Sequence, residues 1–213
     1  MLSVTWLNLG GDRVLPDEFA TQRFNWPVGV CTFGAGLGGR FAPLSNMHEL
    51  PLRLGDVVVA SSETAYQAAK FAAHPHGQAH TLALRGRQAK TYARRNAVLG
   101  QAWDARRRRA MLAALVLKLD QHASVVDCLA DTSGRPIVEV SRHDSYWGAL
   151  PSDIGFTGIN LLGRMLMFLR DVWLEQAPVL RSWVDQEAPR LWPAAHPASG
   201  KGCLRAAGGE VAG

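Results

Sequence analysis

Residues 104–122, DARRRRAMLAALVLKLDQH, carry one of the clearest helical patterns in the chain. Met111, Leu115 and Leu119 recur at helical spacing with Leu112 beside them, so the segment predicts a helix with an apolar stripe. Similar patterns lie on both sides of it. Further helices are expected at 62–74, 77–84, 87–99, 123–130 and 159–176, with a short one at 178–188.

Strand signals are few and short. They lie at 2–9, 28–33 and 136–140, and at 52–61, where Gly55-Asp56 predicts a hairpin turn. Pro178 and later prolines punctuate the chain after the last long helix, so a mostly flexible tail is expected there. A helical majority with a few short strands predicts an α+β fold in a single compact domain.

The composition excludes several classes of protein. The chain has 213 residues, of which 47% are hydrophobic and 19% charged, so it is not wholly disordered. No apolar run approaches the roughly 18–20 residues of a membrane span, and the start, MLSVTWLNLGGDRV, lacks the basic segment of a signal peptide. Three widely spaced cysteines indicate a reducing compartment. The cytoplasm and no membrane partner are therefore expected.

Positive charge is concentrated in one segment. Residues 85–109 hold nine basic residues against one acid, a local charge of +8, whereas the rest of the chain has a net charge of −3. Such a segment indicates a nucleic-acid partner or a phosphate-bearing substrate. The alternative is a solvated helix face without a partner.

The helix at 62–74 carries the most informative set of side chains. Glu63, Gln67 and Lys70 fall at i, i+4 and i+7 and share one stripe, with Tyr66 beside them. A plain exposed face with an intrahelical ion pair explains this pattern. Composition alone favours this interpretation over a site, in which the stripe would provide a carboxylate for acid–base work, an amide for orientation and an ammonium for phosphate. Both interpretations stay open at this point.

Two later motifs also carry side chains suited to binding. Trp147 follows Asp144 and offers a flat surface for a purine or pyrimidine beside a carboxylate, unless it is a core residue that closes a turn. Asn160 suits an N-cap of the last long helix, whose N-terminus can hold an anion.

Two other patterns are weak. Residues 34–39 match G-x-G-x-x-G, but Pro43 opposes the helix that a dinucleotide site requires, so a flexible loop is favoured. His74, His76 and His80 cluster without a cysteine or carboxylate at fixed spacing, so no metal site is expected.

Taken in order, eight segments resemble the motifs of one family. They are Leu44-Ser45-Asn46-Met47, Ser62 to Phe71, Gln88-Ala89-Lys90, Trp103-Asp104 with Arg107, Met111 and Lys118, Leu129 to Thr132, Ile137-Val138-Glu139, Asp144 to Gly148, and Gly158 to Arg170. Each motif alone is weak, but their order is specific. The series resembles the NADAR family, which includes the YbiA-like proteins, over residues 40–172.

The resemblance implies a mostly helical α+β fold and hydrolysis of an N-glycosidic bond between a base-like nitrogen and a phosphorylated ribose. It implies two substrate classes, ribosylamino-pyrimidine phosphates of riboflavin synthesis and ADP-ribose attached to guanine in nucleic acid. It implies a domain at 28–176, flanked by an N-terminal extension at 1–27 and a C-terminal extension at 177–213 that is mostly a flexible tail. Neither a cofactor nor a metal is expected, and the oligomeric state is not predicted.

The resemblance also assigns roles to residues. Glu63 is expected to be the catalytic carboxylate, with Asp144 as a second candidate, and Lys70 to face phosphate or to attack the anomeric carbon as a Schiff-base nucleophile. The remaining expected site residues bind substrate. They are Asn46, Tyr66, Gln67, Lys90, Trp103, Trp147 and Asn160.

The chain departs from the family pattern at two places. Thr64-Ala65 stands where the family has His-Tyr after the glutamate, and Leu150 replaces a small residue after the Trp-Gly pair. These departures leave open a second function, a module that binds ADP-ribose or NAD derivatives without turnover. A third is a nucleic-acid-binding domain that is indifferent to ADP-ribose and binds through the basic segment.

Overall fold

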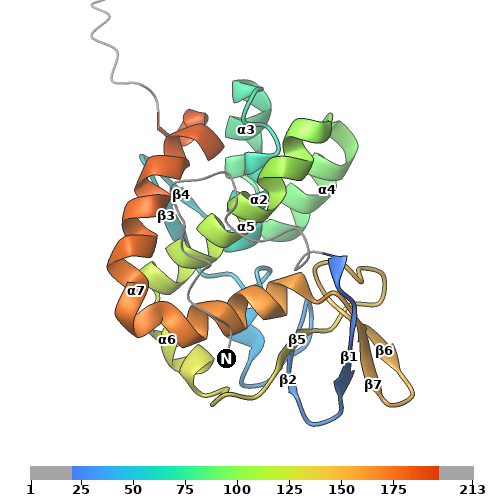
Figure 1. Ribbon diagram of the computed structural model, residues 1–213. Coiled ribbons are helices and arrows are strands. Elements are labelled where there is room, and N and C mark those ends of the chain that lie inside the picture. Colours follow the sequence, from blue (N-terminus) through green and yellow to red (C-terminus); the bar gives the residue numbers. More distant parts are fainter. Residues whose placement is uncertain (1–20, 197–213) are drawn as a thin grey trace, which may run out of the picture.

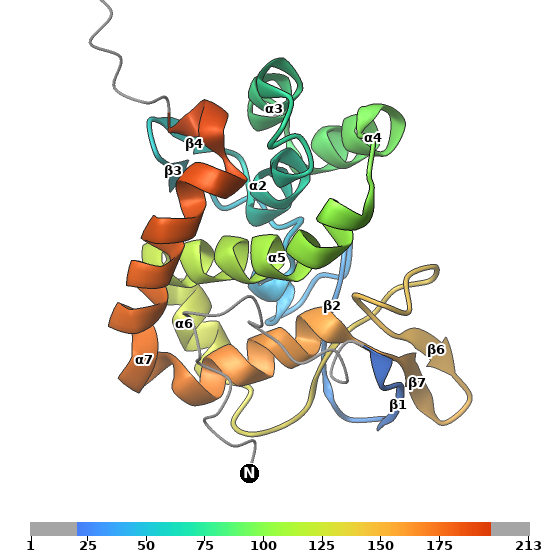
Figure 2. The ribbon, with the colours of Figure 1, turned by 45° about the horizontal axis from the view of Figure 1, so that its top comes forward.

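A computed structural model describes residues 21–196, and helix α5 (Gln101–Gln121) crosses its middle (Figures 1 and 2). Residues 110–116 of this helix are all buried, so this part of α5 is surrounded by protein on every side. The predicted stripe of Met111, Leu115 and Leu119 lies in the core, and so does Leu112. The middle of the segment 104–122 therefore lies at the centre of the hydrophobic core.

The remaining helices of the described part are α2 (Ser62–Ala69), α3 (Pro75–Leu82), α4 (Gly86–Asn96), α6 (Ala123–Ala130) and α7 (Leu161–Leu191), with 3-10 turns η2 (Ala42–Leu44) and η3 (Pro193–Ala195). Of these helices, α2, α6 and α7 pack against α5, and α3 and α4 pack against α2. The helical majority with a few short strands confirms the α+β fold class. The helix predicted at 62–74 ends earlier, at Ala69, and Pro75 begins α3 instead of only stopping α2.

Helix α7 continues where the sequence predicts a break. The expected end near residue 176 is wrong, because one helix runs from Leu161 to Leu191 with Pro178 and Pro189 inside it. A proline inside a helix removes one hydrogen bond and bends the axis, and the ribbon of α7 is bent in its middle (Figure 2). The apolar stripe continues through the second half at Leu180 and Val184, which are buried. This burial keeps the helix intact.

The segment after α7 is fastened to α2 and α3. The Trp192 indole is fully buried and donates to the Ala65 carbonyl at 2.7 Å. The Gln78 side chain donates to the carbonyls of Ala68 and Leu191 and accepts from the Ala194 amide. Residues 177–196 of the expected C-terminal extension are therefore folded against the helices, whereas 197–213 lie outside the described residues.

Three small sheets complete the described fold. β3 (Leu52–Leu54) and β4 (Val57–Val59) form the predicted hairpin, where Gly55 has a φ of +55°. β2 (Cys31–Phe33) pairs in parallel with β5 (Ile137–Glu139), so segments far apart in sequence lie side by side. The predicted strand at 2–9 falls outside the described residues.

The third sheet is missed by the sequence analysis. β1 (Phe24–Pro27), β7 (Gly155–Gly158) and β6 (Leu150–Ser152) pair antiparallel in that order, and Figure 2 shows them at one end of the molecule. Residues 24–27 of the expected N-terminal extension thus belong to a sheet. The strands escape the pattern because they are three or four residues long, and Gly155 and Gly158 interrupt any alternation.

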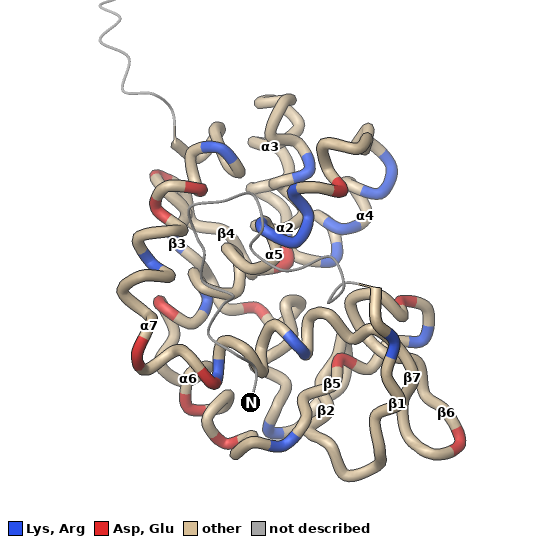
Figure 3. The backbone as a smooth tube through the Cα atoms, viewed as in Figure 1, with Lys and Arg blue, Asp and Glu red and all other residues tan. Residues whose placement is uncertain are grey.

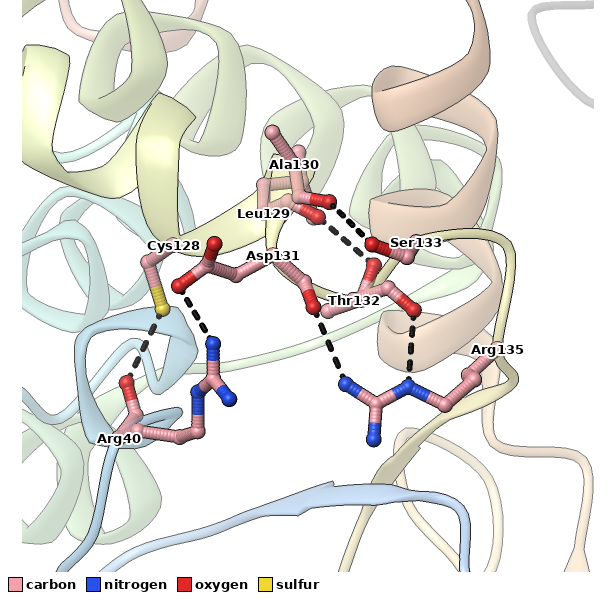
Figure 4. A network of polar contacts seen from close by, with 8 residues as sticks. All are labelled: Arg40, Cys128, Leu129, Ala130, Asp131, Thr132, Ser133 and Arg135. Carbon is pink, nitrogen blue, oxygen red and sulfur yellow. Dashed lines mark hydrogen bonds and ion pairs between the residues drawn. The ribbon is translucent and has the colours of Figure 1, made fainter.

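A polar network holds the end of α6 and the loop that precedes η2 (Figure 4). Its residues are Arg40, Cys128, Leu129, Ala130, Asp131, Thr132, Ser133 and Arg135. The Arg135 guanidinium donates to the carbonyls of Asp131 and Thr132, which the helix end leaves without helical partners. Arg40 pairs with the Asp131 carboxylate at 2.7 Å, and its carbonyl accepts from the Cys128 thiol. The glycine-rich loop 34–39 is thereby anchored at its far end.

Lys118 lies inside the core on α5. Its side chain is 1% exposed, and its Nζ donates to the Ser45 carbonyl at 2.7 Å. Burial lowers the pKa of this amine to about 7, because the charged form loses its hydration. No acidic side chain of the described residues pairs with it. The contact fixes the backbone next to Asn46.

We expect Lys118 to make stability depend on pH. Its folded pKa of about 7 lies below the ordinary value of 10.5, so the unfolded chain binds more protons between these pH values, and stability rises with pH there. Relative to Lys118→Met, the wild-type free energy of unfolding should increase by about 2 kcal/mol between about pH 7 and pH 9. Urea denaturation at the two pH values measures it, and parallel curves for both proteins would contradict the assignment.

Candidate active site

A cavity of about 620 Å³ opens between α2, α4, the loop 34–39 and the segment that follows β5. This volume is within the usual range for small-molecule sites. The cavity gathers eight of the residues that the sequence analysis singles out. They are Asn46, Glu63, Tyr66, Gln67, Lys70, Lys90, Asp144 and Trp147.

Helix α2 positions the first wall of the cavity. Ser61 is its N-cap, and its hydroxyl accepts from the Thr64 amide at 3.3 Å. The Glu63 amide donates to the Asn46 carbonyl, so a helix-terminal donor holds the loop before β3. Every residue of α2 is buried. The interpretation of this helix as an exposed face is therefore wrong.

Glu63 is held by one hydrogen bond and one ion pair. Its side chain is buried, and its Oε1 accepts from Gln67 Nε2 at 2.8 Å and lies 3.9 Å from Lys90 Nζ. The i, i+4 spacing on α2 brings the carboxylate and the amide together, and α4 supplies the ammonium. Gln67 Oε1 is buried without a partner in the described structure. An acceptor in this state favours a bound molecule that donates a hydrogen bond to it.

Lys70 and Tyr66 extend the same wall. Burial lowers the pKa of the Lys70 amine, as does Lys90, against the opposing effect of Glu63. Lys70 Nζ lies 5.5 Å from the centre of the Tyr66 ring and 5.8 Å from that of Trp103. Burial raises the pKa of the Tyr66 phenol well above its usual value, so the phenol stays protonated.

Asn46 lies next to Glu63 in the cavity lining. Its Oδ1 accepts from the Ser62 hydroxyl at 2.9 Å, and its Nδ2 contacts the Met111 sulfur at 3.0 Å. The side chain is 3% exposed yet lines the cavity. These contacts fix the amide plane, so Asn46 presents a preset polar surface to a ligand.

A second part of the lining comes from the segment after β5. Asp144 Oδ1 accepts from the amides of Tyr146 and Trp147, both at 2.9 Å, and so shapes the turn that presents Trp147. The Trp147 ring meets Tyr66 edge-on, with centroids 5.6 Å apart and planes at 77°. Asp144 thus has a positioning role at the cavity, in addition to the carboxylate role that the resemblance assigns to it.

Glu139, the last residue of β5, lines the cavity and is missed by the sequence analysis. Burial raises the pKa of its carboxyl group to about 8, with further contributions from Glu63 and Asp144 and an opposing one from Lys90. The signal was present in the Ile137-Val138-Glu139 motif, because an acid at the end of a short strand is held rigidly. Arg142 is a second missed residue of the cavity wall.

Two predicted site residues do not line the cavity. Trp103 is buried behind Tyr66, with ring centroids 5.6 Å apart, and supports the wall from outside. Asn160 is fully buried, and its side chain accepts from the Glu139 amide at 2.9 Å and donates to the Ile137 carbonyl at 2.8 Å. The structure thus gives Asn160 a role in holding β5, in place of the expected contact to phosphate.

Asn160 also begins α7 in an unusual way. It occupies the N-cap position, as predicted, with a φ of +53°, but its side chain makes no capping hydrogen bond. Gly163 follows one turn later, where a Cβ would stand 2.3 Å from the Ile137 carbonyl oxygen. Asparagine and glycine at these two positions therefore let α7 approach β5 closely.

The glycine-rich loop lines the cavity without opening a helix. Ala35, Gly36 and Leu37 contribute to the lining, and the next regular element is η2, which contains Pro43. The favoured interpretation as a loop agrees with this geometry. No group of three His, Cys, Asp or Glu side chains in residues 21–196 is arranged to hold a metal ion. Within the same residues, none of the helices combines the length and apolarity needed to cross a membrane.

Comparison with known proteins gives three findings. The model of the NADAR domain matches residues 39–173. The riboflavin biosynthesis protein PYRR, chloroplastic, of Zea mays is 33% identical over 76 residues, which are 36% of this chain and 12% of that protein. The NMR structure of the E. coli protein YbiA superposes with a TM-score of 0.58 at 25% identity, covering 75% of this chain and 94% of that one.

We expect the two side-chain hydrogen bonds of Asn160 to contribute to the stability of the fold. Asn160→Ala should lower the free energy of unfolding by about 2–4 kcal/mol, because two buried backbone groups lose their partners and alanine disfavours a positive φ. Asn160→Gly should recover roughly 1 kcal/mol of this loss, because glycine tolerates the backbone conformation. Urea denaturation of the three proteins measures both effects. Variants within about 0.5 kcal/mol of the wild type would contradict the role.

Proposed function

The chain belongs to the NADAR domain family, and we propose that it hydrolyses the N-glycosidic bond between a phosphorylated ribose and a base-like nitrogen. One observation carries the proposal. A buried glutamate, Glu63, is held by an amide and an ammonium on one wall of a cavity whose other wall carries an aromatic ring, Trp147. This arrangement fits a sugar that develops positive charge beside a flat leaving group.

The chemistry needs three contributions from the protein. Cleavage of an N-glycoside develops an oxocarbenium-like charge on the ribose, which a carboxylate stabilises while it activates a water molecule. Glu63 takes this role. Gln67, through its unpartnered Oε1, and Asn46 orient the ribose hydroxyls. Trp147 stacks on the base.

The phosphate binds to the cations of the cavity. Lys70, Lys90 and Arg142 line it, and each can donate to phosphate oxygens. Lys90 lies close to Glu63 as well, so it joins the phosphate region to the carboxylate. These cations favour a phosphorylated ribose over a free nucleoside.

Two substrates fit this class, and different observations favour each. The relationship to a protein named for riboflavin biosynthesis favours a ribosylamino-pyrimidine phosphate. Lys and Arg positions recur along α4 (Figure 3). This basic surface favours ADP-ribose on guanine in nucleic acid, because Arg87, Arg94 and Arg95 are exposed and pair with no acid of the described residues. Assays on both substrates decide between them.

A module that binds without turnover is the alternative, and the departures at Thr64-Ala65 were its support. Neither residue lines the cavity. The Thr64 hydroxyl donates to the Leu84 carbonyl, and the Ala65 carbonyl accepts from Trp192. Leu150 likewise lies in β6, outside the lining. The departures thus leave the polar set of the cavity intact, which favours catalysis. The maize relative is named chloroplastic, so a cytoplasmic location stays a prediction.

Glu63→Gln tests the central carboxylate. We expect turnover to fall by about 10²–10⁴-fold, because the amide can neither take a proton from water nor offset the ribose charge. The assay measures ADP-ribose released from an ADP-ribosylated guanine oligonucleotide and ribose 5-phosphate released from the ribosylamino-pyrimidine phosphate. Glu175→Gln on the exposed face of α7 is the matched control. Near wild-type turnover in a folded Glu63→Gln protein would remove Glu63 from this role.

Lys70→Ala separates direct attack by water from a covalent route. For direct attack, KM should rise about 10–100-fold through the loss of one charged contact to phosphate, with little change in kcat. Borohydride should then trap no adduct between the wild-type protein and ribose. A trapped adduct on Lys70, together with the loss of kcat in Lys70→Ala, would establish the Schiff-base route instead.

A further inference from the structure

We propose that Glu139 is the general acid of this cavity and gives its carboxyl proton to the nitrogen that leaves the ribose. The inference rests on the proposed hydrolysis of an N-glycoside and supplies the proton donor that this reaction needs. Glu139 is named by none of the site expectations. The structure places it in the cavity lining at the end of β5, together with Glu63 of α2.

The backbone of Glu139 is fixed on three sides. Its amide donates to Asn160 Oδ1 at 2.9 Å, and its carbonyl accepts from the Ala149 amide at 2.8 Å. It also stands opposite Phe33 in the parallel pair of β2 and β5. This frame fixes the point from which the Glu139 side chain enters the cavity.

The two glutamates of the cavity have different surroundings. Glu63 accepts a hydrogen bond from Gln67 and faces Lys90 at 3.9 Å. The Glu139 carboxyl group receives no hydrogen bond and forms no ion pair with any described residue. Paired carboxyl groups in unlike surroundings divide the roles of acid and base. Glu63 is then the base, and Glu139 the acid.

The charged groups around Glu139 reinforce this division. Glu63 and Lys70 line the cavity from α2, Lys90 from α4, and Arg142 and Asp144 from the segment after β5. Burial is the largest effect, and it raises the pKa of the Glu139 carboxyl group to about 8, with Glu63 and Asp144 adding to it and Lys90 opposing it. The group therefore carries its proton at neutral pH.

The reaction balances with these two residues. The bond between the anomeric carbon and the nitrogen breaks, its electron pair stays on the nitrogen, and the Glu139 proton joins that nitrogen. Water attacks the anomeric carbon and loses a proton to Glu63. Solvent then returns a proton to Glu139 and accepts one from Glu63. Glu139 and Trp147 both line the cavity, so the proton donor and the ring that stacks on the base face the same ligand space.

Glu139→Gln tests the proposal on whichever substrate the wild type hydrolyses. We expect kcat to fall by about 10²–10⁴-fold, the usual contribution of general acid catalysis. The wild-type kcat/KM should fall above about pH 8, where Glu139 loses its proton, and this alkaline limb should be absent from the variant. Glu139→Asp should restore part of the rate and the limb. Glu175→Gln should match the wild type in both.

A second substrate separates acid catalysis from mere support of the fold. Nicotinamide ribose 5-phosphate has a cationic pyridinium nitrogen that leaves without protonation. Glu139→Gln should therefore hydrolyse it within about tenfold of the wild-type rate. An equal loss on both substrates, or an alkaline limb that persists in the variant, would overturn the assignment while leaving the proposed function standing. Wild-type protein without turnover on any N-riboside would overturn the proposed function itself.

A second test needs no substrate, so it also applies to variants whose stability is too low for a turnover assay. The raised folded pKa of Glu139 stabilises the protein below about pH 4.5, and this stabilisation is lost as the pH rises toward 8. The difference in thermal midpoint between the wild type and Glu139→Gln should therefore fall over that range. A difference that is constant with pH would show that Glu139 ionises at its ordinary pKa, and the proposal would fail.

Discussion

Helix α2 is buried on every side although one of its stripes carries Glu63 and Gln67. Burying a carboxylate without partners costs several kcal/mol, so this helix is stable only where other elements supply donors. Gln67 supplies one from the same helix and Lys90 supplies another from α4. The C-terminal segment covers the far side, where Trp192 donates to the Ala65 carbonyl. The position of α2 thus depends on α4 and on the segment after α7 together.

The two walls of the cavity are built by different physical means. The α2 wall is a helix whose polar stripe is presented by the 3.6-residue period. The other wall is a short parallel strand pair, held by Asn160 and by the close approach of Gly163, followed by a turn that Asp144 shapes. One wall offers a hydrogen-bonded carboxylate. The other offers an unpaired carboxyl group beside an aromatic ring. The cavity therefore contains two carboxyl groups in unlike surroundings.

The local elements could be predicted to a good extent. The stripe of Met111, Leu115 and Leu119 predicts α5, and Gly55-Asp56 predicts the hairpin, because both depend on neighbours in sequence. The course of α7 through Pro178 could not be predicted, because its second half is stabilised by burial against α5 and not by local propensity. Strands β6 and β7 were missed for a related reason, since their pairing with β1 supplies their hydrogen bonds.

The sequence alone determined which residues of α2 share a stripe, the order of motifs that resembles the NADAR family, and the place of the basic segment. All three are properties of spacing along the chain. The tertiary structure decided which polar groups from distant parts of the chain come into contact. It placed Glu139 in the cavity and engaged Asn160 with the backbone of β5. Such pairings join residues far apart in sequence, and only the packed core fixes which distant groups come within hydrogen-bonding distance.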